Sequence, residues 1–363
     1  MIRIPVYRPT LSGNESIYVQ ECMNSGWISS KGKFVDLFEK KFSDYLGMRH
    51  SVSICNGTAA LHVALLALGI GPGDEVIVPT LTYVASVNAI KYVGARPVFV
   101  DSEPDSWQID PEEIRRKLTD RTKAILVVHL YGHPCDMDQI MEIAEERGIR
   151  VIEDCAEAFG SRYKGRLCGT FGDVSTFSFY GNKTITTGEG GMVVSNDDDI
   201  ADMAVRFHGQ GLAKDREYWH DIIGYNFRMT NICAAIGLAQ LERADLIVTR
   251  KREVAEMYIS QLDRRKIEFL REKEGMFSSY WMCSVLFRSP KERSMGRADL
   301  LKAGIETRPV FNPIHLMPMY EGGPDQLPVA CDLASRGINL PSFPTLTSDE
   351  IEEICGILNS VHS

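Results

Sequence analysis

The chain has 363 residues, which is long enough to bury a large core and favours about two domains. Hydrophobic residues make up 44% and charged residues 25%, as in an ordinary globular protein. A net charge of -9 and an isoelectric point near 5.5 argue against nucleic acid as a main partner, because phosphate backbones bind to basic faces. A local basic pocket for a nucleotide sugar remains compatible with this charge.

The longest apolar runs, such as 124–128, are too short to span a membrane, and the first residues lack the apolar region of a secretory signal. We therefore expect a cytoplasmic protein without membrane contact. The nine cysteines are odd in number and include no CxxC pair, so they indicate neither a disulfide framework nor a zinc site. Most of them should be small buried side chains, and we expect no metal.

Short apolar runs alternate with helical patterns from about residue 50 to 210, which is typical of an α/β layer with a mainly parallel sheet. The pattern predicts strands over 51–55, 75–78, 95–100, 124–130, 150–153, 174–179 and 191–195. The helices predicted between them cover 58–68, 82–92, 111–117 and 137–147.

The next predicted helix begins near residue 232 and continues towards 262, with room for a kink, and such a long element can bridge two domains. After it we expect a strand over 280–287, a helix near 297–302 and a final helix over 348–358. The chain is therefore predicted to form a large α/β domain over 1–245 and a smaller α+β domain over 246–363. We expect the first residues, up to about 30, to pack on the small domain or on a partner subunit.

One lysine, Lys183, lies in a polar loop between an apolar strand and a Gly-rich turn that leads into the next strand. Asp154 ends an earlier short strand. A lysine that forms a Schiff base and an aspartate that holds a protonated ring nitrogen are the two protein groups that pyridoxal phosphate most needs. Taken alone, Lys183 fits a loop lysine that pairs with a nearby acid better, because most lysines face solvent, and only the surrounding residues favour the cofactor.

Polar residues follow the other predicted strands at the same edge of the sheet, where ligands collect. Gly57 and Thr58 open a helix, and free N–H groups there can bind phosphate, although such residues also serve as ordinary helix caps. Tyr83 could stack on a flat ring or belong to the core. Ser178 can donate its hydroxyl to the phosphate, and Glu157 could face the cofactor or the substrate.

At these residues the chain resembles the DegT/DnrJ/EryC1/StrS family of pyridoxal-phosphate sugar aminotransferases. The resemblance implies the fold of aspartate aminotransferase (PLP fold type I), with a mainly parallel central sheet and a smaller C-terminal α+β domain. It runs nearly from end to end through the segments Ser25-Gly26-Trp27-Ile28-Ser29, Asn56-Gly57-Thr58-Ala59-Ala60-Leu61, Gly73-Asp74-Glu75-Val76-Ile77-Val78-Pro79, Glu153-Asp154-Cys155-Ala156-Glu157-Ala158, Gly188-Glu189-Gly190-Gly191, Tyr225-Asn226-Phe227-Arg228-Met229 and Ile338-Asn339-Leu340-Pro341.

By this resemblance, the catalytic residues are Lys183, which binds the cofactor covalently, and Asp154, which pairs with its ring nitrogen. Further cofactor contacts are implied for Gly57, Thr58, Tyr83, Glu157, Ser178 and Asn226. Asn226 would reach the phosphate from a neighbouring subunit, which implies a homodimer or a larger assembly. The candidates for substrate contact are Trp27, Ser29, Arg228 and His315, although a loop or packing role is equally open for His315.

Within the family, the segments 177–191, 218–221 and 315–320 are most similar to members that aminate C4 of GDP-4-keto-6-deoxy-mannose, usually with glutamate as donor, for O-antigen synthesis. Many members that use other nucleotide sugars carry Gln or His at the position of Glu157. A similar dehydratase carries histidine in place of Lys183, so Lys183 favours transamination.

Three alternatives remain open at this point. The substrate could be a UDP- or dTDP-linked ketosugar, or the chain could be a regulatory relative that binds the cofactor without turnover. An NAD-dependent enzyme has little support, because no GxGxxG follows an early strand.

Overall fold

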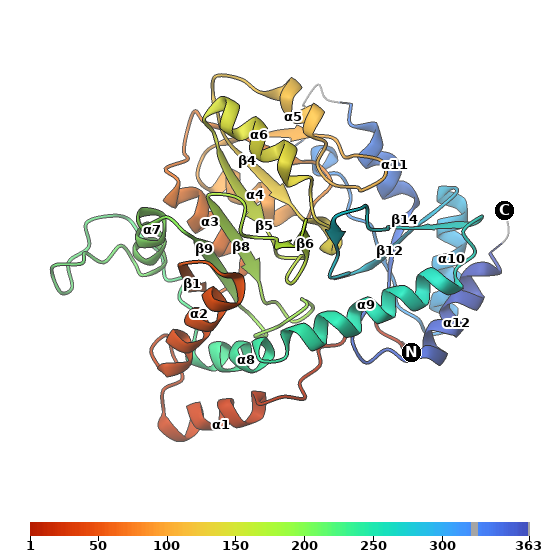
Figure 1. The fold of residues 1–363 in the computed structure, drawn as a ribbon, viewed down its shortest axis with the longest axis horizontal. Helices are drawn as coiled ribbons and strands as arrows, with labels where there is room; N and C mark the ends of the chain where they lie inside the picture. The colour runs from red at the N-terminus through yellow and green to blue at the C-terminus, as the bar shows by residue number, and fades with distance from the viewer. Residues whose placement is uncertain (321–325, 362–363) are drawn as a thin grey trace.

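The computed structural model describes residues 1–320 and 326–361. Its main feature is a seven-stranded sheet with the order β1-β9-β8-β5-β4-β2-β3 (Figure 1). Neighbouring strands from β8 to β3 in this order are parallel, whereas β9 is antiparallel to both of its neighbours. The predicted mainly parallel sheet is therefore confirmed. The strands are β1 (His50–Ile54), β2 (Glu75–Pro79), β3 (Arg96–Val100), β4 (Thr122–Val128), β5 (Arg150–Asp154), β8 (Val174–Ser178) and β9 (Gly191–Ser195).

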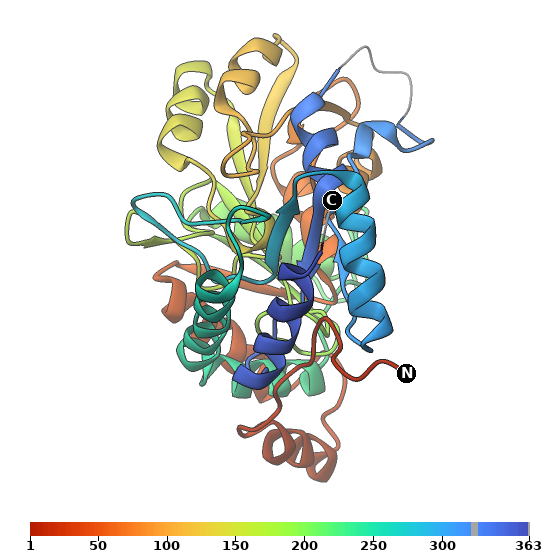
Figure 2. The same cartoon turned by 90° about the vertical axis from the view of Figure 1, so that its right-hand side faces the viewer.

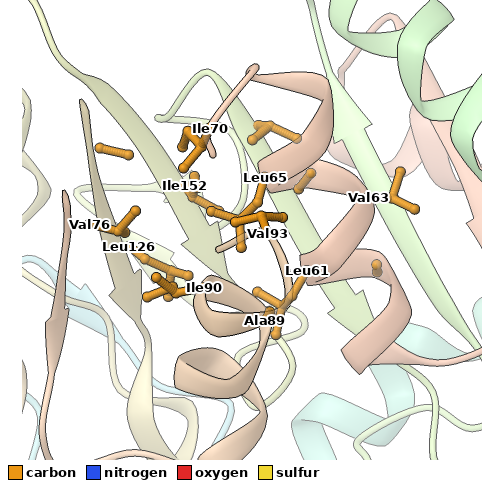
Figure 3. Packing of buried hydrophobic residues seen from close by; sticks show 14 of the residues in the cluster. Leu61, Val63, Leu65, Ile70, Val76, Ala89, Ile90, Val93, Leu126 and Ile152 are labelled. Atoms are coloured by element: carbon orange, nitrogen blue, oxygen red, sulfur yellow. The ribbon is translucent and has the colours of Figure 1, made fainter. Parts of the chain in front are cut away.

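Helices cover both faces of this sheet, because successive strand side chains point to opposite sides. Val76, Leu126 and Ile152 face a core formed with α3 (Gly57–Ala67) and α4 (Val84–Tyr92), where Leu61, Leu65 and Ile90 pack against them (Figure 3). The neighbouring residues Ile77, Ile125 and Val151 face the opposite core, with α5 (Pro111–Lys117) and α6 (Met137–Arg147). Both faces of the central strands are buried in these cores, so the strands are fixed in register.

The β1 end of the sheet is covered by helices for which the sequence patterns gave no prediction. They are α2 (Lys33–Leu46) and α7 (Asp198–His208), and another helix without a prediction, α1 (Glu15–Ser25), packs on α8 (Asn231–Leu241). Phe34, Phe38 and Phe42 lie one turn apart on α2 and pack into a buried cluster that includes Phe177 and Phe179. This cluster supports the strand β8 and the loop that follows it.

The predicted helix over 232–262 is in fact two helices, α8 (Asn231–Leu241) and α9 (Ala244–Gln261), which run almost end to end (Figure 1). Arg243, between them, departs from helical geometry with φ -118° and ψ 12°. The break lets α8 pack on α1 and α2, while α9 packs beside the final helix. None of the described helices has both the length and the apolarity to cross a bilayer.

A second sheet of four antiparallel strands has the order β10-β12-β14-β13 and carries its own buried core. Figure 2 shows two of its helices, α10 and α12, next to each other. Ile4 at the N-terminus pairs with Ile305 and is buried in this core. Whether the chain divides at residue 245 stays a prediction. The elements are β10 (Ile267–Phe269), β12 (Cys283–Phe287), α10 (Pro290–Lys302), β13 (Arg308–Pro309), α11 (Pro328–Arg336), β14 (Gly337–Leu340) and α12 (Ser348–Asn359).

A small three-stranded sheet joins segments that are far apart in the sequence. Its strands are β6 (Arg162–Tyr163), β7 (Arg166–Leu167) and β11 (Met276–Phe277). Two 3-10 turns, η1 (Leu130–Gly132) and η2 (Ile314–Leu316), follow β4 and β13. The prediction extended the strand β4 to residue 130, but Tyr131 has a φ of 56°, so the chain turns here.

Candidate active site

A cavity of about 570 Å³ lies where the parallel strands of the large sheet end. Ligands of open α/β sheets collect at this edge, because loops from several strands meet there. Seven residues that the sequence singled out line this one cavity: Gly57, Thr58, Tyr83, Asp154, Glu157, Ser178 and Lys183. The structure brings them together, while the role of each remains a prediction.

One end of the cavity is formed by the start of α3. Asn56 caps this helix, since its Oδ1 accepts a hydrogen bond from the Ala59 N–H at 2.8 Å. The first N–H groups of a helix have no partner within it and favour an anion. A Cβ added at Gly57 would lie 2.7 Å from the Cβ of Ser178, so only glycine leaves the space between these two residues open. We call this space at the start of α3 the phosphate cradle. Capping and anion binding are thus compatible at this helix.

Lys183 is half-buried in the loop between β8 and β9. Its Nζ lies 4.0 Å from the centre of the Trp281 ring. Burial lowers the pKa of Lys183, because it disfavours the ammonium form, and the charges of Glu157 and Asp154 partly oppose this. A lysine with a lowered pKa is a better nucleophile and can act as a base near neutral pH.

Asp154 ends strand β5 and is buried at the floor of the cavity. Its Oδ2 accepts a hydrogen bond from the Ser86 hydroxyl at 2.8 Å, and its Oδ1 accepts one from the Ala156 N–H at 3.0 Å. Burial raises the pKa of Asp154, whereas these two donors and the charge of Lys183 lower it. The carboxylate is therefore oriented and ready to hold a cationic N–H.

Glu157 is a second buried carboxyl group in the cavity. Its Oε2 accepts a hydrogen bond from the Tyr131 N–H at 2.8 Å. Burial raises the pKa of Glu157 to about 7, and the charge of Lys183 opposes the rise. This group can therefore hold or release a proton at neutral pH.

Sequence reasoning missed several residues at the site. Trp281 and Phe311 line the cavity from segments around the second sheet, and the ring of Phe311 lies 5.6 Å from that of Tyr83. No local pattern identifies such residues, because only the tertiary fold places them here. Ser86 could have been found, since it lies on the predicted helix one turn after Tyr83.

A further buried pair lies behind Asp154. His129 Nε2 lies 3.1 Å from Oε2 of Glu153. The two oxygens of this carboxylate also accept hydrogen bonds from the N–H groups of Gly169, Phe171 and Gly172 at 2.6 to 2.7 Å. The first acid of the Glu153-Asp154 pair therefore anchors a loop, while the second faces the cavity.

Five predicted site residues are not among the described residues that line this cavity. They are Trp27, Ser29, Asn226, Arg228 and His315. The backbone carbonyls of Trp27 and Ser29 accept hydrogen bonds from Asn231 at 2.7 and 2.6 Å. His315 Nδ1 lies 2.7 Å from the Thr80 hydroxyl, which is the packing contact left open for it. Asn226 is exposed and accepts a hydrogen bond from Arg228 at 3.3 Å.

The residues present fit pyridoxal phosphate. The cradle at Gly57 suits a phosphate, Tyr83 is an exposed aromatic ring at the wall, and an oriented carboxylate lies near a lysine with a lowered pKa. Asn182 lines the same cavity, and its Oδ1 is buried without a hydrogen-bond partner among the residues described. Such an atom is expected to find its partner in a bound ligand or water.

Residues 9–359 match the model of the DegT/DnrJ/EryC1/StrS aminotransferase family. The chain belongs to this family. A relative from Escherichia coli O157:H7, "GDP-perosamine synthase", is 58% identical over 99% of both chains. Another of the same name, from Vibrio cholerae, is 49% identical over 98% of both. The solved "Putative sugar aminotransferase Spr1654 from Streptococcus pneumoniae, PLP-form" is 30% identical with a TM-score of 0.94, over 99% of this chain and 98% of that one.

Membership of the DegT/DnrJ/EryC1/StrS family confirms the predicted fold class. It also confirms the predicted enzyme class, an aminotransferase, and the predicted cofactor, pyridoxal phosphate. An aminotransferase needs an amino donor and a carbonyl acceptor, and both must reach the cofactor in the same cavity.

Proposed function

We propose that this protein transfers an amino group, with glutamate as donor, to C4 of GDP-4-keto-6-deoxy-mannose and so makes GDP-perosamine. The observation that carries this proposal is the likeness to two relatives named GDP-perosamine synthase, at 58% and 49% identity over nearly the whole of each chain. The cavity supports it, because it places Lys183, Asp154 and a phosphate cradle together.

Pyridoxal phosphate, when bound, supplies a ring that takes up electrons from the carbon that loses its proton. Lys183 then acts through its Nζ, which removes that proton as a general base and returns it as a general acid. Asp154 keeps a proton on the ring nitrogen, because a carboxylate beside it favours the charged form. Both residues line the cavity, with Asp154 buried and Lys183 half-buried.

The remaining cavity residues bind and orient. Gly57, Thr58 and Ser178 hold the phosphate at the start of α3, and Tyr83 packs on one face of the ring. Trp281 and Phe311 complete the wall of the cavity, Trp281 beside Lys183 and Phe311 beside Tyr83. Because one lysine in one cavity serves both donor and acceptor, the two half-reactions must alternate.

We also propose that the active assembly is a homodimer in which Asn226 contacts the phosphate bound by the neighbouring subunit. The segment before it exposes two large apolar side chains among charged ones, because Tyr218 is exposed to 91% and Ile223 to 87%. A second copy of the chain would cover these side chains. Trp27, Ser29, Arg228 and His315 are proposed substrate contacts, and the product would serve O-antigen synthesis in the cytoplasm.

The test supplies one 4-keto-6-deoxy sugar on three carriers, GDP, UDP and dTDP, with glutamate as donor. Formation of the amino sugar and of the 2-oxo acid is followed by mass spectrometry. We expect turnover with the GDP sugar, loss of turnover in Lys183→Ala, and no change in the control Lys40→Ala, which alters an exposed lysine of α2.

Other outcomes of this test separate the alternatives. A preference for the UDP or dTDP sugar would overturn the proposed carrier and leave aminotransfer intact. Protein loaded with cofactor that aminates none of the three sugars would instead favour a regulatory relative.

A further inference from the structure

The loop that carries Lys183 is held by residues from other parts of the fold. Trp281 presents its ring to the Lys183 Nζ at 4.0 Å, and its indole N–H donates to the Asn182 carbonyl at 2.7 Å. The hydroxyl of Tyr7 donates to the carbonyl of Lys183 itself. Both the backbone of this loop and the end of the lysine side chain are therefore fixed from outside.

A second lysine fixes these two aromatic residues. Lys251 on α9 is completely buried, and its Nζ donates to the Trp281 carbonyl at 3.1 Å. It also donates to the Ser342 carbonyl at 2.6 Å and to the Ser342 hydroxyl at 3.2 Å, and it lies 5.3 Å from the centre of the Tyr7 ring. These contacts use the donors of an ammonium group and tie Trp281 and Tyr7 to one point in the core.

We propose that Trp281 is a positioning residue for Lys183, whose free ammonium group rests on the indole face each time the lysine is released from the cofactor. Lys251 and Tyr7 fix the indole in this position. The proposal rests on the proposed role of Lys183 as the lysine that binds the cofactor. The indole attracts the ammonium form and not the neutral amine, so it keeps a proton available beside the reacting carbon.

The physical consequence is measurable without turnover. Only neutral Lys183 condenses with the aldehyde of added pyridoxal phosphate, forming a C=N bond and releasing water, so the pH dependence of this capture by the apoprotein reports the pKa of Lys183. Loss of the aromatic face should move the midpoint of this dependence down by about 0.5 to 1 pH unit. Ionisable groups of the cofactor also affect capture, but they are the same for every variant, so they do not contribute to the difference between the midpoints.

The experiment compares Trp281→Leu and Trp281→Phe with the wild type, and capture is followed by absorbance. Both variants lose the indole N–H, but only Trp281→Phe keeps an aromatic face, so we expect a smaller shift in Trp281→Phe. Phe171→Leu is the matched control, because the Phe171 ring holds Arg166 at 4.3 Å and does not line this cavity, so its midpoint should not move. Lys183→Ala gives the blank.

Equal midpoints in the wild type and Trp281→Leu would overturn the proposal. If Trp281→Leu does not fold, Trp281→Tyr and Trp281→Phe must still give shifts in the same direction, and their absence would overturn it too. Failure of the wild type to capture the cofactor at Lys183 would instead refute the proposed function, so the two failures can be told apart.

Discussion

The substitution Glu157→Gln tests the electrostatics of the cavity in the apoprotein. Burial raises the pKa of Glu157 from 4.5 to about 7. Between these two pH values the folded protein binds more protons at this group than the unfolded chain does, so the free energy of unfolding falls as the pH rises. The rise of about 2.5 pH units corresponds to about 3 kcal/mol, which is lost in full above pH 7.

Glutamine is neutral at every pH, and its side-chain carbonyl can still accept the hydrogen bond from the Tyr131 N–H. We therefore expect Glu157→Gln and the wild type to unfold with equal free energies at pH 4.5. At pH 8 the variant should be more stable by up to about 3 kcal/mol. Urea unfolding of the cofactor-free protein, at one protein concentration and over pH 4.5 to 8, measures this difference.

Glu189→Gln is the matched control, because Glu189 lines the same cavity but is exposed. It removes the same charge and should leave the pH profile of stability unchanged. A Glu157→Gln variant that is no more stable than the wild type at pH 8 would show that Lys183 compensates the buried carboxylate fully, and the reasoning from burial would be wrong.

Three further changes have defined outcomes. Gly57→Ala places a Cβ 2.7 Å from that of Ser178 and should weaken pyridoxal phosphate binding at least about tenfold, which equilibrium titration of the apoprotein measures. Ser86→Ala removes a 2.8 Å hydrogen bond that lowers the pKa of Asp154, so the acid limb of the kcat profile should move to higher pH. Burial lowers the pKa of Lys251 from 10.5 to about 8, so between these pH values the unfolded chain binds more protons than the folded protein does. The unfolding free energy of the wild type minus that of Lys251→Met should therefore rise by about 3 kcal/mol from pH 8 to 10.5. A difference that does not change with pH would contradict this.

The sequence was sufficient for the sheet and for the residues that directly follow its strands. Buried parallel strands read as short apolar runs, and a polar residue after such a run lies at the ligand-binding edge. Asp154, Thr58 and Lys183 were found in this way. The helix α2 carried a usable signal as well, because Phe34 and Phe38 are one turn apart.

The partners of these residues could not be predicted, because they arise from chain crossings that leave no local pattern. Lys251 illustrates this point: on a long helix it reads as a solvated lysine, yet it is fully buried. Its position depends on Trp281 and Ser342, which come from segments around the second sheet. Such contacts become visible only when the two sheets are placed side by side.

Asp154 and Glu157 are three residues apart, and the fold gives them different tasks by giving them different donors. Asp154 receives a hydroxyl and a backbone N–H, which favour its ionised form against burial. Glu157 receives one backbone N–H, and burial dominates, so its pKa rises to about 7. Burial raises the pKa of both groups, but two hydrogen-bond donors oppose the rise at Asp154, so Asp154 is the better placed of the two to keep a negative charge. The negative charges of Glu157 and Asp154 both raise the pKa of Lys183. We infer that Asp154 pairs with the charged ring nitrogen of the cofactor, while the protonation state of Glu157 sets the pKa of Lys183.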